Sequence, residues 1–142
     1  MIGPGEEIAF PVTIAWGDQD PFGHVNNVAY FRYLESARMH LLERLGFMEL
    51  HRATGLSVIL AATQCQFRKA INWPATIEVR MSIPRIGHTS FDIAYRILGA
   101  DGSLHAEGTS TQVVYDYTEM CKCPMPESIR NTIFALFKPG TP

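Results

Sequence analysis

The sequence predicts an α+β domain in which one long helix lies against an antiparallel sheet. The chain has 142 residues, which fits a single domain over residues 1–142. Apolar residues repeat at helical spacing between Asn27 and Leu45, and after Gly55 the apolar pattern changes to a period of two that short turns interrupt. One helix followed by a run of strands is typical of a two-layer α+β arrangement.

The first expected elements are a strand from Ile8 to Trp16 and the long helix. The strand segment is short, apolar and rich in β-branched residues, and Pro11 favours an edge position. In the helix, one apolar stripe is formed by Tyr30, Leu34, Ala37, Leu41 and Leu45. Asn26 or Asn27 can cap the start of this helix, and Gly46 stands where a glycine ends one.

Four more strands and a short helix are expected after the long helix. The strands are predicted from Leu56 to Ala70, Thr76 to Ile86, Ser90 to Leu98 and Leu104 to Tyr117. In the first of them, strict alternation places Ile59, Ala61, Thr63, Cys65 and Phe67 on one face. The segment from Gly99 to Gly102 predicts a hairpin, and a helix is expected between Met125 and Phe137.

The composition excludes several classes of function. The net charge of −2 gives no indication of nucleic-acid binding, and no apolar run approaches the roughly 20 residues of a membrane span. Met1 to Glu7 lacks the basic start and apolar core of a signal peptide, so a cytoplasmic location is expected. Cys65, Cys121 and Cys123 lack the usual zinc spacing, which favours free thiols and no metal.

The segment from Trp16 to Asn27 concentrates polar groups just before the long helix. Pro21 and Gly23 indicate a turn, so the segment is a loop that brings carboxylates and amides to a helix N-terminus. Free N–H groups and a partial positive charge at that end can stabilise an oxyanion, and a carboxylate beside them can act as base or nucleophile. The simpler alternative is that these residues only cap the helix.

The loop and helix together resemble the hotdog-fold thioesterases, in the branch of 4-hydroxybenzoyl-CoA thioesterase and the bacterial acyl-CoA thioesterases. The matching features are an aromatic residue, D-x-D, G-H-V-N-N, a helical tyrosine and E-x-A-R, here Trp16, Asp18, Asp20, Gly23 to Asn27, Tyr30 and Glu35 to Arg38. The resemblance implies a curved antiparallel sheet wrapped around one central helix. It also implies hydrolysis of an acyl-CoA substrate, no cofactor besides the coenzyme A of that substrate, and a homodimer or homotetramer.

The same resemblance suggests roles for the loop residues. Asp20 is expected to be the catalytic base or nucleophile, whereas Asp18 is expected to hold the loop together. The backbone N–H groups of Asn27 and Val28 are candidates for binding the thioester oxygen. His24 is a candidate acid or substrate ligand, with a hydrogen-bonded turn histidine as the alternative.

Basic residues and a second carboxylate complete the candidates. Arg68, Lys69 and Arg85 lie at predicted strand ends or turns, where they bind the phosphates of coenzyme A or are merely solvated. Another hotdog branch uses a helical Glu or Asp after a His-Gly-Gly motif, which is absent here. Glu35 is therefore expected to be a solvated side chain paired with Arg32 or Arg38.

Two other functions remain open at the level of sequence. Hotdog hydratases and dehydratases of enoyl thioesters carry a motif similar to G-D-x-N-P-x-H, and Gly17 to His24 resembles it. The extra residue before His24 and the following Asn-Asn pair fit the thioesterase motif better. A non-catalytic module that binds acyl thioesters would have the same fold.

Overall fold

The computed structural model describes residues 7–140. Their elements are β1 (Ile8–Thr13), the short 3-10 helix η1 (Trp16–Asp18), α1 (Asn27–Leu45), α2 (Phe47–Thr54), β2 (Leu56–Phe67), β3 (Thr76–Ile86), β4 (Ser90–Leu98), β5 (Leu104–Asp116), β6 (Cys121–Lys122) and α3 (Glu127–Phe137). Within that range no helix is both long enough and apolar enough to cross a membrane. Of the segment used for the signal-peptide prediction, residues 1–6 lie outside the described range.

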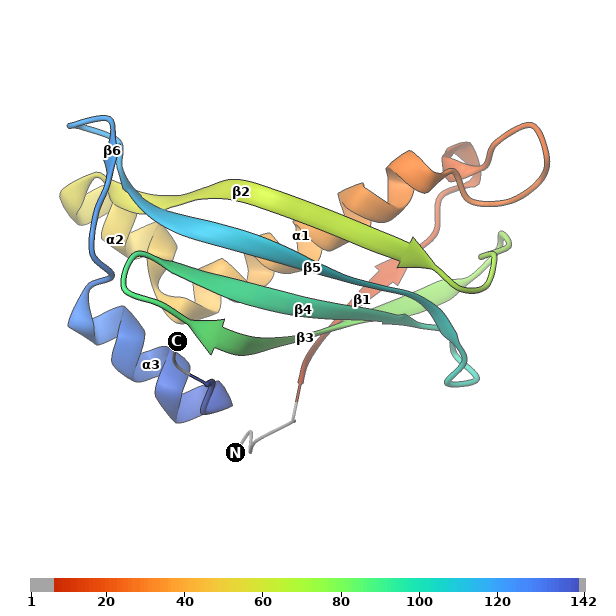
Figure 1. The fold of residues 1–142 in the computed structure, drawn as a ribbon. Coiled ribbons are helices and arrows are strands. Elements are labelled where there is room, and N and C mark those ends of the chain that lie inside the picture. Colours follow the sequence, from red (N-terminus) through yellow and green to blue (C-terminus); the bar gives the residue numbers. More distant parts are fainter. Residues whose placement is uncertain (1–6, 141–142) are drawn as a thin grey trace.

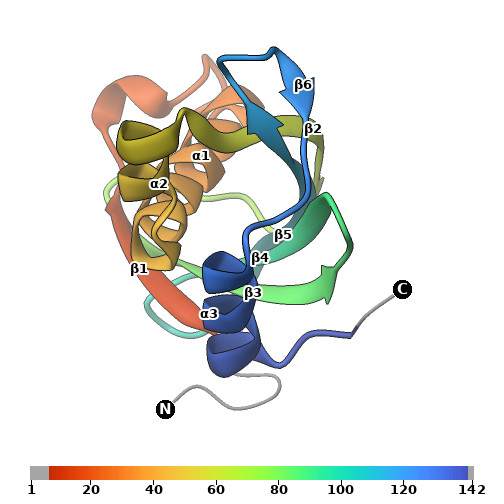
Figure 2. The ribbon, with the colours of Figure 1, turned by 90° about the vertical axis from the view of Figure 1, so that its left-hand side faces the viewer.

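The strands form one antiparallel sheet in the order β1-β3-β4-β5-β2, and β6 adds a short pair with β5. The sheet curves around α1, which lies against its concave face together with α2 (Figures 1 and 2). Helix α3 lies at the β3 side of this arrangement (Figure 2). The predicted α+β architecture with one long helix is confirmed.

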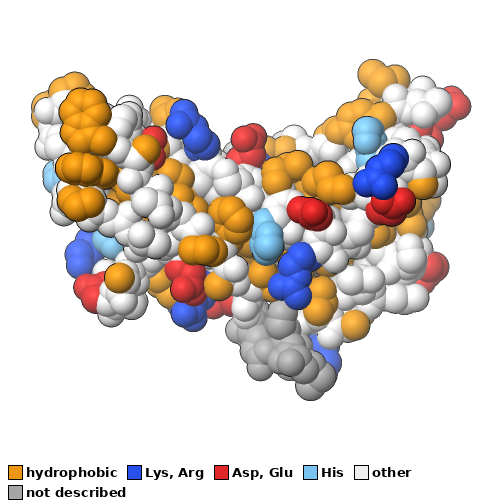
Figure 3. Space-filling model, turned by 180° about the vertical axis from the view of Figure 1, so that it is seen from behind, with side chains coloured by type: hydrophobic (Ala, Val, Ile, Leu, Met, Phe, Trp, Pro, Cys, Tyr) orange, Lys and Arg blue, Asp and Glu red, His pale blue; other side chains and the backbone are white. Residues whose placement is uncertain are grey.

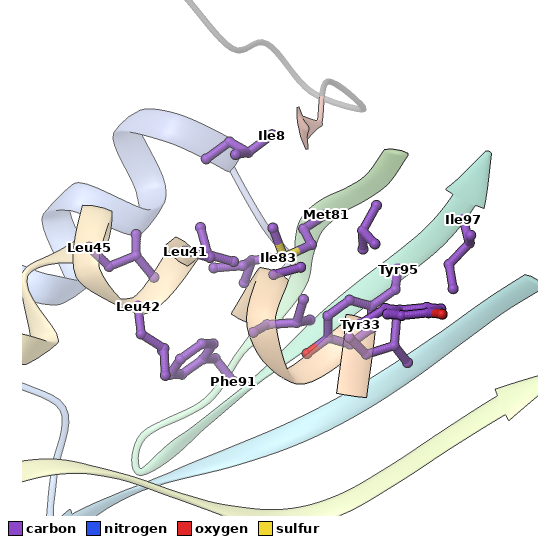
Figure 4. Packing of buried hydrophobic residues seen from close by; sticks show 14 of the residues in the cluster. Ile8, Tyr33, Leu41, Leu42, Leu45, Met81, Ile83, Phe91, Tyr95 and Ile97 are labelled. Atoms are coloured by element: carbon purple, nitrogen blue, oxygen red, sulfur yellow. The ribbon is translucent and has the colours of Figure 1, made fainter. Parts of the chain in front are cut away.

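The apolar stripe of α1 is the centre of the core. All five predicted stripe residues are buried, and they pack against the inward-facing residues of β3 and β4. Figure 4 shows Leu41 and Leu45 of α1 in one cluster with Met81, Ile83 and Phe91 of the sheet. Each such side chain contributes about 1.5–3 kcal/mol when it is removed from water, so packing rather than local propensity stabilises α1.

Both ends of α1 lie where the sequence places them. The side chain of Asn26 caps the start by accepting a hydrogen bond from the Val28 N–H at 3.0 Å. Gly46 ends the helix with φ at 96°, a left-handed conformation in which glycine carries no steric penalty. The same glycine starts α2, a helix that the sequence analysis missed. Phe47, the first residue of α2, is fully buried and stacks on Phe91 at 5.8 Å, so a contact distant in sequence stabilises this short helix.

The first strand is shorter than predicted. It ends at Thr13, and the chain then turns because the Asp18 N–H donates to the Ala15 carbonyl at 3.0 Å. The Ala15 N–H in turn donates to the Asp18 carboxylate at 3.2 Å. Trp16 therefore lies in η1 rather than in the strand.

The prediction of one uniform alternating face in β2 was wrong. Leu60 pairs with Gln112 and Ala62 with Thr111, so Ala61 forms a bulge that reverses the alternation. Four residues pair with buried positions of β5 and are hence directed toward α1: Val58, Leu60, Thr63 and Phe67. Cys65, between Thr63 and Phe67 in the alternation, shares their face and pairs with the half-buried Gly108. Phe67 confirms this by packing edge-on against Tyr30 of α1, with ring centroids 4.8 Å apart. The strand ends at Phe67 rather than at Ala70.

Candidate active site

The loop before α1 is closed by backbone hydrogen bonds. The Asp20 N–H donates to the His24 carbonyl at 2.7 Å, and the Gly23 N–H returns to the Asp20 carbonyl at 3.1 Å. Gly23 has φ at 83°, which permits this tight turn. The Val25 N–H donates to the Ile71 carbonyl at 3.0 Å and so anchors the loop to the segment before β3. The position of Asp20 is therefore set by the main chain.

The half-buried carboxylate of Asp20 has two different oxygens. Oδ1 accepts hydrogen bonds from the N–H groups of Phe22 at 2.9 Å and His24 at 3.3 Å. Among residues 7–140, no donor is hydrogen-bonded to Oδ2. Oδ1 therefore has the structural role of a turn residue, while Oδ2 is available for chemistry.

The helix N-terminus supplies one free donor rather than the two that the sequence predicted. The Val28 N–H is used by the Asn26 cap, and the Ala29 N–H donates to the Asn26 carbonyl at 2.9 Å. The Asn27 N–H forms no hydrogen bond with any described residue. The prediction that Val28 binds the substrate oxygen therefore needs correction, and Asn27 remains the candidate.

Asp20 and Asn27 line the same cavity, which has a volume of about 360 Å³. Its wall is formed by Asp20, Val25, Asn27, Tyr30, Phe67, Arg68, Lys69 and Ala70. Two of the predicted basic residues thus lie beside the predicted catalytic group. The imidazole of His24 is exposed and is not part of this wall; only its backbone is bonded to Asp20.

The three predicted basic residues have different environments. The Arg68 guanidinium forms an ion pair with Glu107 at 3.0 Å, whereas the Lys69 ammonium has no ion-pair partner within residues 7–140. Arg85 lies near the far end of β3 and pairs with Asp92 at 2.7 Å. This pair holds the pKa of the Asp92 carboxyl below its usual value. The structure therefore does not bring Arg85 to the cavity that contains Asp20.

Asp18 has the structural role that the sequence suggested. Its Oδ2 accepts a hydrogen bond from the Tyr33 hydroxyl at 2.7 Å as well as from the Ala15 N–H. Arg32 approaches the other oxygen at 3.7 Å. Burial and the hydrogen bond to Asp18 raise the pKa of Tyr33, so this phenol stays neutral. Together these contacts join η1 to α1.

A second cavity, of about 490 Å³, lies farther along α1, between that helix, α2, β2 and β5. Glu35 lines it, and within the described chain it forms no ion pair with Arg32 or Arg38, contrary to the sequence expectation. Arg38 is only 8% exposed, and its Nη1 donates to the Tyr95 hydroxyl at 3.2 Å. Its burial was not predicted from the sequence, although Arg38 stands four residues after Leu34, on the apolar stripe.

The described residues contain no group of three or more His, Cys, Asp or Glu side chains suited to a metal ion. Cys65, Cys121 and Cys123 are free thiols, and burial raises the pKa of Cys65.

Comparison with known proteins identifies the family of this chain. The family model described as the thioesterase-like superfamily matches residues 14–133. The chain belongs to this superfamily. The PA2801 protein of Pseudomonas aeruginosa, a proposed thioesterase, is 31% identical, with a TM-score of 0.79 over 88% of this chain and 96% of that one.

Other members of the fold share less sequence. A gentisyl-coenzyme A thioesterase is 23% identical, with a TM-score of 0.79 over 89% of this chain and 99% of its own. The SAV2348 protein of Staphylococcus aureus, solved in complex with CoA, is 12% identical, with a TM-score of 0.89 over 97% and 87% of the two chains. These structural matches show that the chain has the hotdog fold.

The curated relatives match over only part of their length. A protein of Aquifex aeolicus named as an esterase is 29% identical over 59% of this chain and 66% of its own length. The YsmA protein of Bacillus subtilis is 25% identical over 59% of this chain and 56% of its own length. The chain thus spans less than two thirds of the length of these two relatives.

Proposed function

We propose that the protein hydrolyses an acyl-CoA thioester to a free acid and coenzyme A, in the cavity that contains Asp20. The observation that carries this proposal is the pairing of an anchored carboxylate, with one oxygen free, and an unused N–H at the start of α1. Membership of the thioesterase-like superfamily supports it and favours hydrolysis over the hydratase alternative.

The proposed reaction uses both groups on one carbonyl. The thioester oxygen accepts a hydrogen bond from the Asn27 N–H, where the helix end stabilises the negative charge that develops. The free oxygen of Asp20 either takes a proton from the attacking water or attacks the carbonyl carbon itself. The C–S bond then breaks, the thiolate of coenzyme A takes a proton, and water becomes part of the free acid.

The two routes differ in one intermediate. Direct attack forms an acyl anhydride on Asp20, which water then hydrolyses, whereas the general-base route forms no covalent adduct. Rapid acid quenching of a single turnover, followed by mass spectrometry of the peptide that contains Asp20, separates them. An acyl adduct on that peptide identifies the nucleophilic route.

The coenzyme A end of the substrate is proposed to lie near Lys69 and Arg68. Both residues line the cavity, and their positive charges attract the phosphate groups of coenzyme A. Lys69 is the stronger candidate because Arg68 already pairs with Glu107. A fold relative from Staphylococcus aureus binds CoA, which is consistent with this class of substrate.

We also propose that the protein forms a homodimer or homotetramer through β2. This strand is an edge of the sheet, and an unpaired edge is a template for another chain. Two apolar side chains of β2 itself are exposed on its inner face, Leu60 at 45% and Phe67 at 48%. The side of the molecule opposite to that in Figure 1 also exposes hydrophobic side chains, which lie among charged and other polar ones (Figure 3). Pairing of the β2 edges of two copies leaves neither edge unpaired.

Sedimentation that shows only a 15.9 kDa species at micromolar concentration would contradict this proposal.

A release assay tests the proposed activity. The purified protein is mixed with a panel of acyl-CoA esters that differ in length and aromaticity, and a thiol reagent detects free coenzyme A. Release with at least one ester supports hydrolysis. Loss of enoyl absorbance without release of thiol indicates the hydratase alternative, and binding without either signal indicates a non-catalytic module.

A further inference from the structure

Arg38 is a buried cation that has no counter-ion among residues 7–140. Its guanidinium has no carboxylate within ion-pair distance among residues 7–140, and its Nη1 bonds only to the neutral hydroxyl of Tyr95. Burial raises the pKa of Tyr95, so this phenol does not supply a negative charge at neutral pH. Arginine is rarely buried unless it is paired, because an uncompensated charge in the interior is costly.

The Arg38 side chain is held in place by a polar chain through the core. The Tyr95 hydroxyl lies 2.6 Å from Ser110 Oγ, and Ser110 donates to the Gln112 side chain. Gln112 is completely buried and donates to the Phe91 carbonyl at 3.2 Å. The position of the guanidinium is therefore defined before any ligand binds.

This cation lines the larger cavity, whose wall is otherwise mainly apolar. The apolar part of the wall is formed by Met39, Leu42, Met48, Val58 and Leu60. The wall also contains the polar residues Arg38, His51, Ser57, Gln112 and Tyr117. The side-chain oxygen and nitrogen of Gln112 are already hydrogen-bonded to Ser110 and Phe91. Glu35 also lines the cavity, but it is an exposed residue whose charge is screened by water. The cavity thus suits a ligand with an apolar body and one oxygen acceptor at its buried end.

The larger cavity lies on the same side of α1 as the cavity with Asp20. Both are bounded by α1 and β2. Along the helix, Glu35 is about 12 Å and Arg38 about 16 Å from Asn27, at ~1.5 Å per residue. Between the two cavities, Thr63 on the inner face of β2 is exposed, so α1 does not cover this strip.

We propose that the larger cavity binds the far end of the acyl group and that Arg38 selects acyl groups that carry a carboxylate there. This inference rests on the proposed thioesterase function. The thioester lies at Asn27, the apolar chain follows the strip along β2, and the terminal carboxylate pairs with Arg38. A carboxylate is favoured over a hydroxyl because only an anion compensates the buried charge.

Paired substrates test the selection. Hydrolysis of the mono-CoA thioester of decanedioic acid is compared with that of decanoyl-CoA, which differs only in lacking the terminal carboxylate. We expect kcat/KM to favour the first by about tenfold or more, the size of a desolvated charge pair. In R38Q we expect the preference to disappear, so that kcat/KM is about equal for the two esters. Arg44→Gln, an exposed cation on the same helix, serves as the control and leaves the preference unchanged.

Three results overturn the proposal. The wild-type protein could prefer decanoyl-CoA over the dicarboxylic ester, or it could prefer the ω-hydroxydecanoyl thioester over decanoyl-CoA by as much as the dicarboxylic ester. The third is a preference for the dicarboxylic ester that persists in R38Q. If R38Q does not fold, Leu60→Trp replaces it, because the Leu60 side chain is 45% exposed and takes no part in the hydrogen bonds of the Arg38 network, although Leu60 pairs with Gln112 of that network across the β2–β5 ladder. Filling the cavity lowers kcat/KM for both long esters and spares acetyl-CoA. Unchanged hydrolysis of the long esters by L60W also overturns the proposal.

Binding of a free acid separates this proposal from the thioesterase activity. Calorimetry with octanoate and octan-1-ol requires no turnover. We expect octanoate to bind more tightly, and R38Q to remove that advantage. If no ester is hydrolysed but octanoate binding depends on Arg38, the proposed activity fails and the anion site stands. If esters are hydrolysed without any dependence on Arg38, the anion site fails and the activity stands.

Discussion

The two cavities along α1 are built in different ways. At the start of the helix, backbone hydrogen bonds position Asp20 and leave one carboxylate oxygen and one N–H free. Farther along, side chains of four elements form the wall, and a side-chain network positions Arg38. A site held by the main chain tolerates little change in geometry, whereas a wall of side chains changes with each substitution. The first arrangement suits chemistry and the second suits selection among ligands.

Asp20→Asn gives the largest expected effect and tests whether the chemistry belongs to the first cavity. The amide keeps an oxygen for the Phe22 and His24 N–H groups, but it cannot take a proton from water and is a poor nucleophile. We expect kcat to fall by about 100-fold or more with little change in KM. Glu35→Gln is the matched control in the second cavity. Retained activity in the Asp20 variant with loss in the Glu35 variant would reverse the assignment.

Asp18→Asn is expected to change stability rather than catalysis. Asp18 Oδ2 accepts hydrogen bonds from Ala15 and Tyr33, and a neutral amide oxygen accepts them more weakly than a carboxylate does. The amide nitrogen that replaces Oδ1 also no longer attracts Arg32. The free energy of unfolding should fall by about 1 kcal/mol, measured by urea denaturation at pH 7. A loss of kcat as large as that of the Asp20 variant, at unchanged stability, would place Asp18 in the reaction.

Lys69→Ala is expected to raise KM for acyl-CoA several-fold while kcat stays nearly constant. An exposed contact to phosphate contributes about 1 kcal/mol or less, equally in the ground and transition states. The effect should shrink as salt is added, because salt screens exposed charges. Arg85→Ala is the control and should leave KM unchanged, since Arg85 pairs with Asp92 away from the cavity. A larger increase in KM for Arg85→Ala than for Lys69→Ala would contradict this placement.

Asp92→Asn gives the smallest expected effect, because Asp92 lies outside both cavities. Arg85 lowers the pKa of Asp92, so the pair stabilises the folded state above the ordinary carboxyl pKa of 3.8 and loses this contribution as the pH falls through the lower folded value. We expect a loss of about 1 kcal/mol or less at pH 7, since the pair is partly exposed. The difference should vanish in acid. Urea unfolding of the wild-type protein and the variant at neutral and acidic pH measures this difference in stability. An equal difference at the two pH values would exclude the ion pair as its cause.

Local patterns in the sequence determined most of the elements. The predicted bounds of α1, Asn27–Leu45, match the structure, and so do those of β3 and β4. These segments combine strong periodicity with caps or turns at their ends, and both signals act over a few residues. The motif from Trp16 to Asn27 was also sufficient to place Asp20 and Asn27 beside one another, because both belong to one short loop and the helix that follows it.

Only the tertiary structure decided the features that depend on distant partners. Helix α2 rests on Phe91 of β4, and the reversed face of β2 follows from a bulge seen only in its pairing with β5. Arg38 bonds to Tyr95, and Arg85 pairs with Asp92 rather than lining the cavity. In each case a residue's environment is set by a chain segment that lies far away in sequence, so spacing alone carries no information about it.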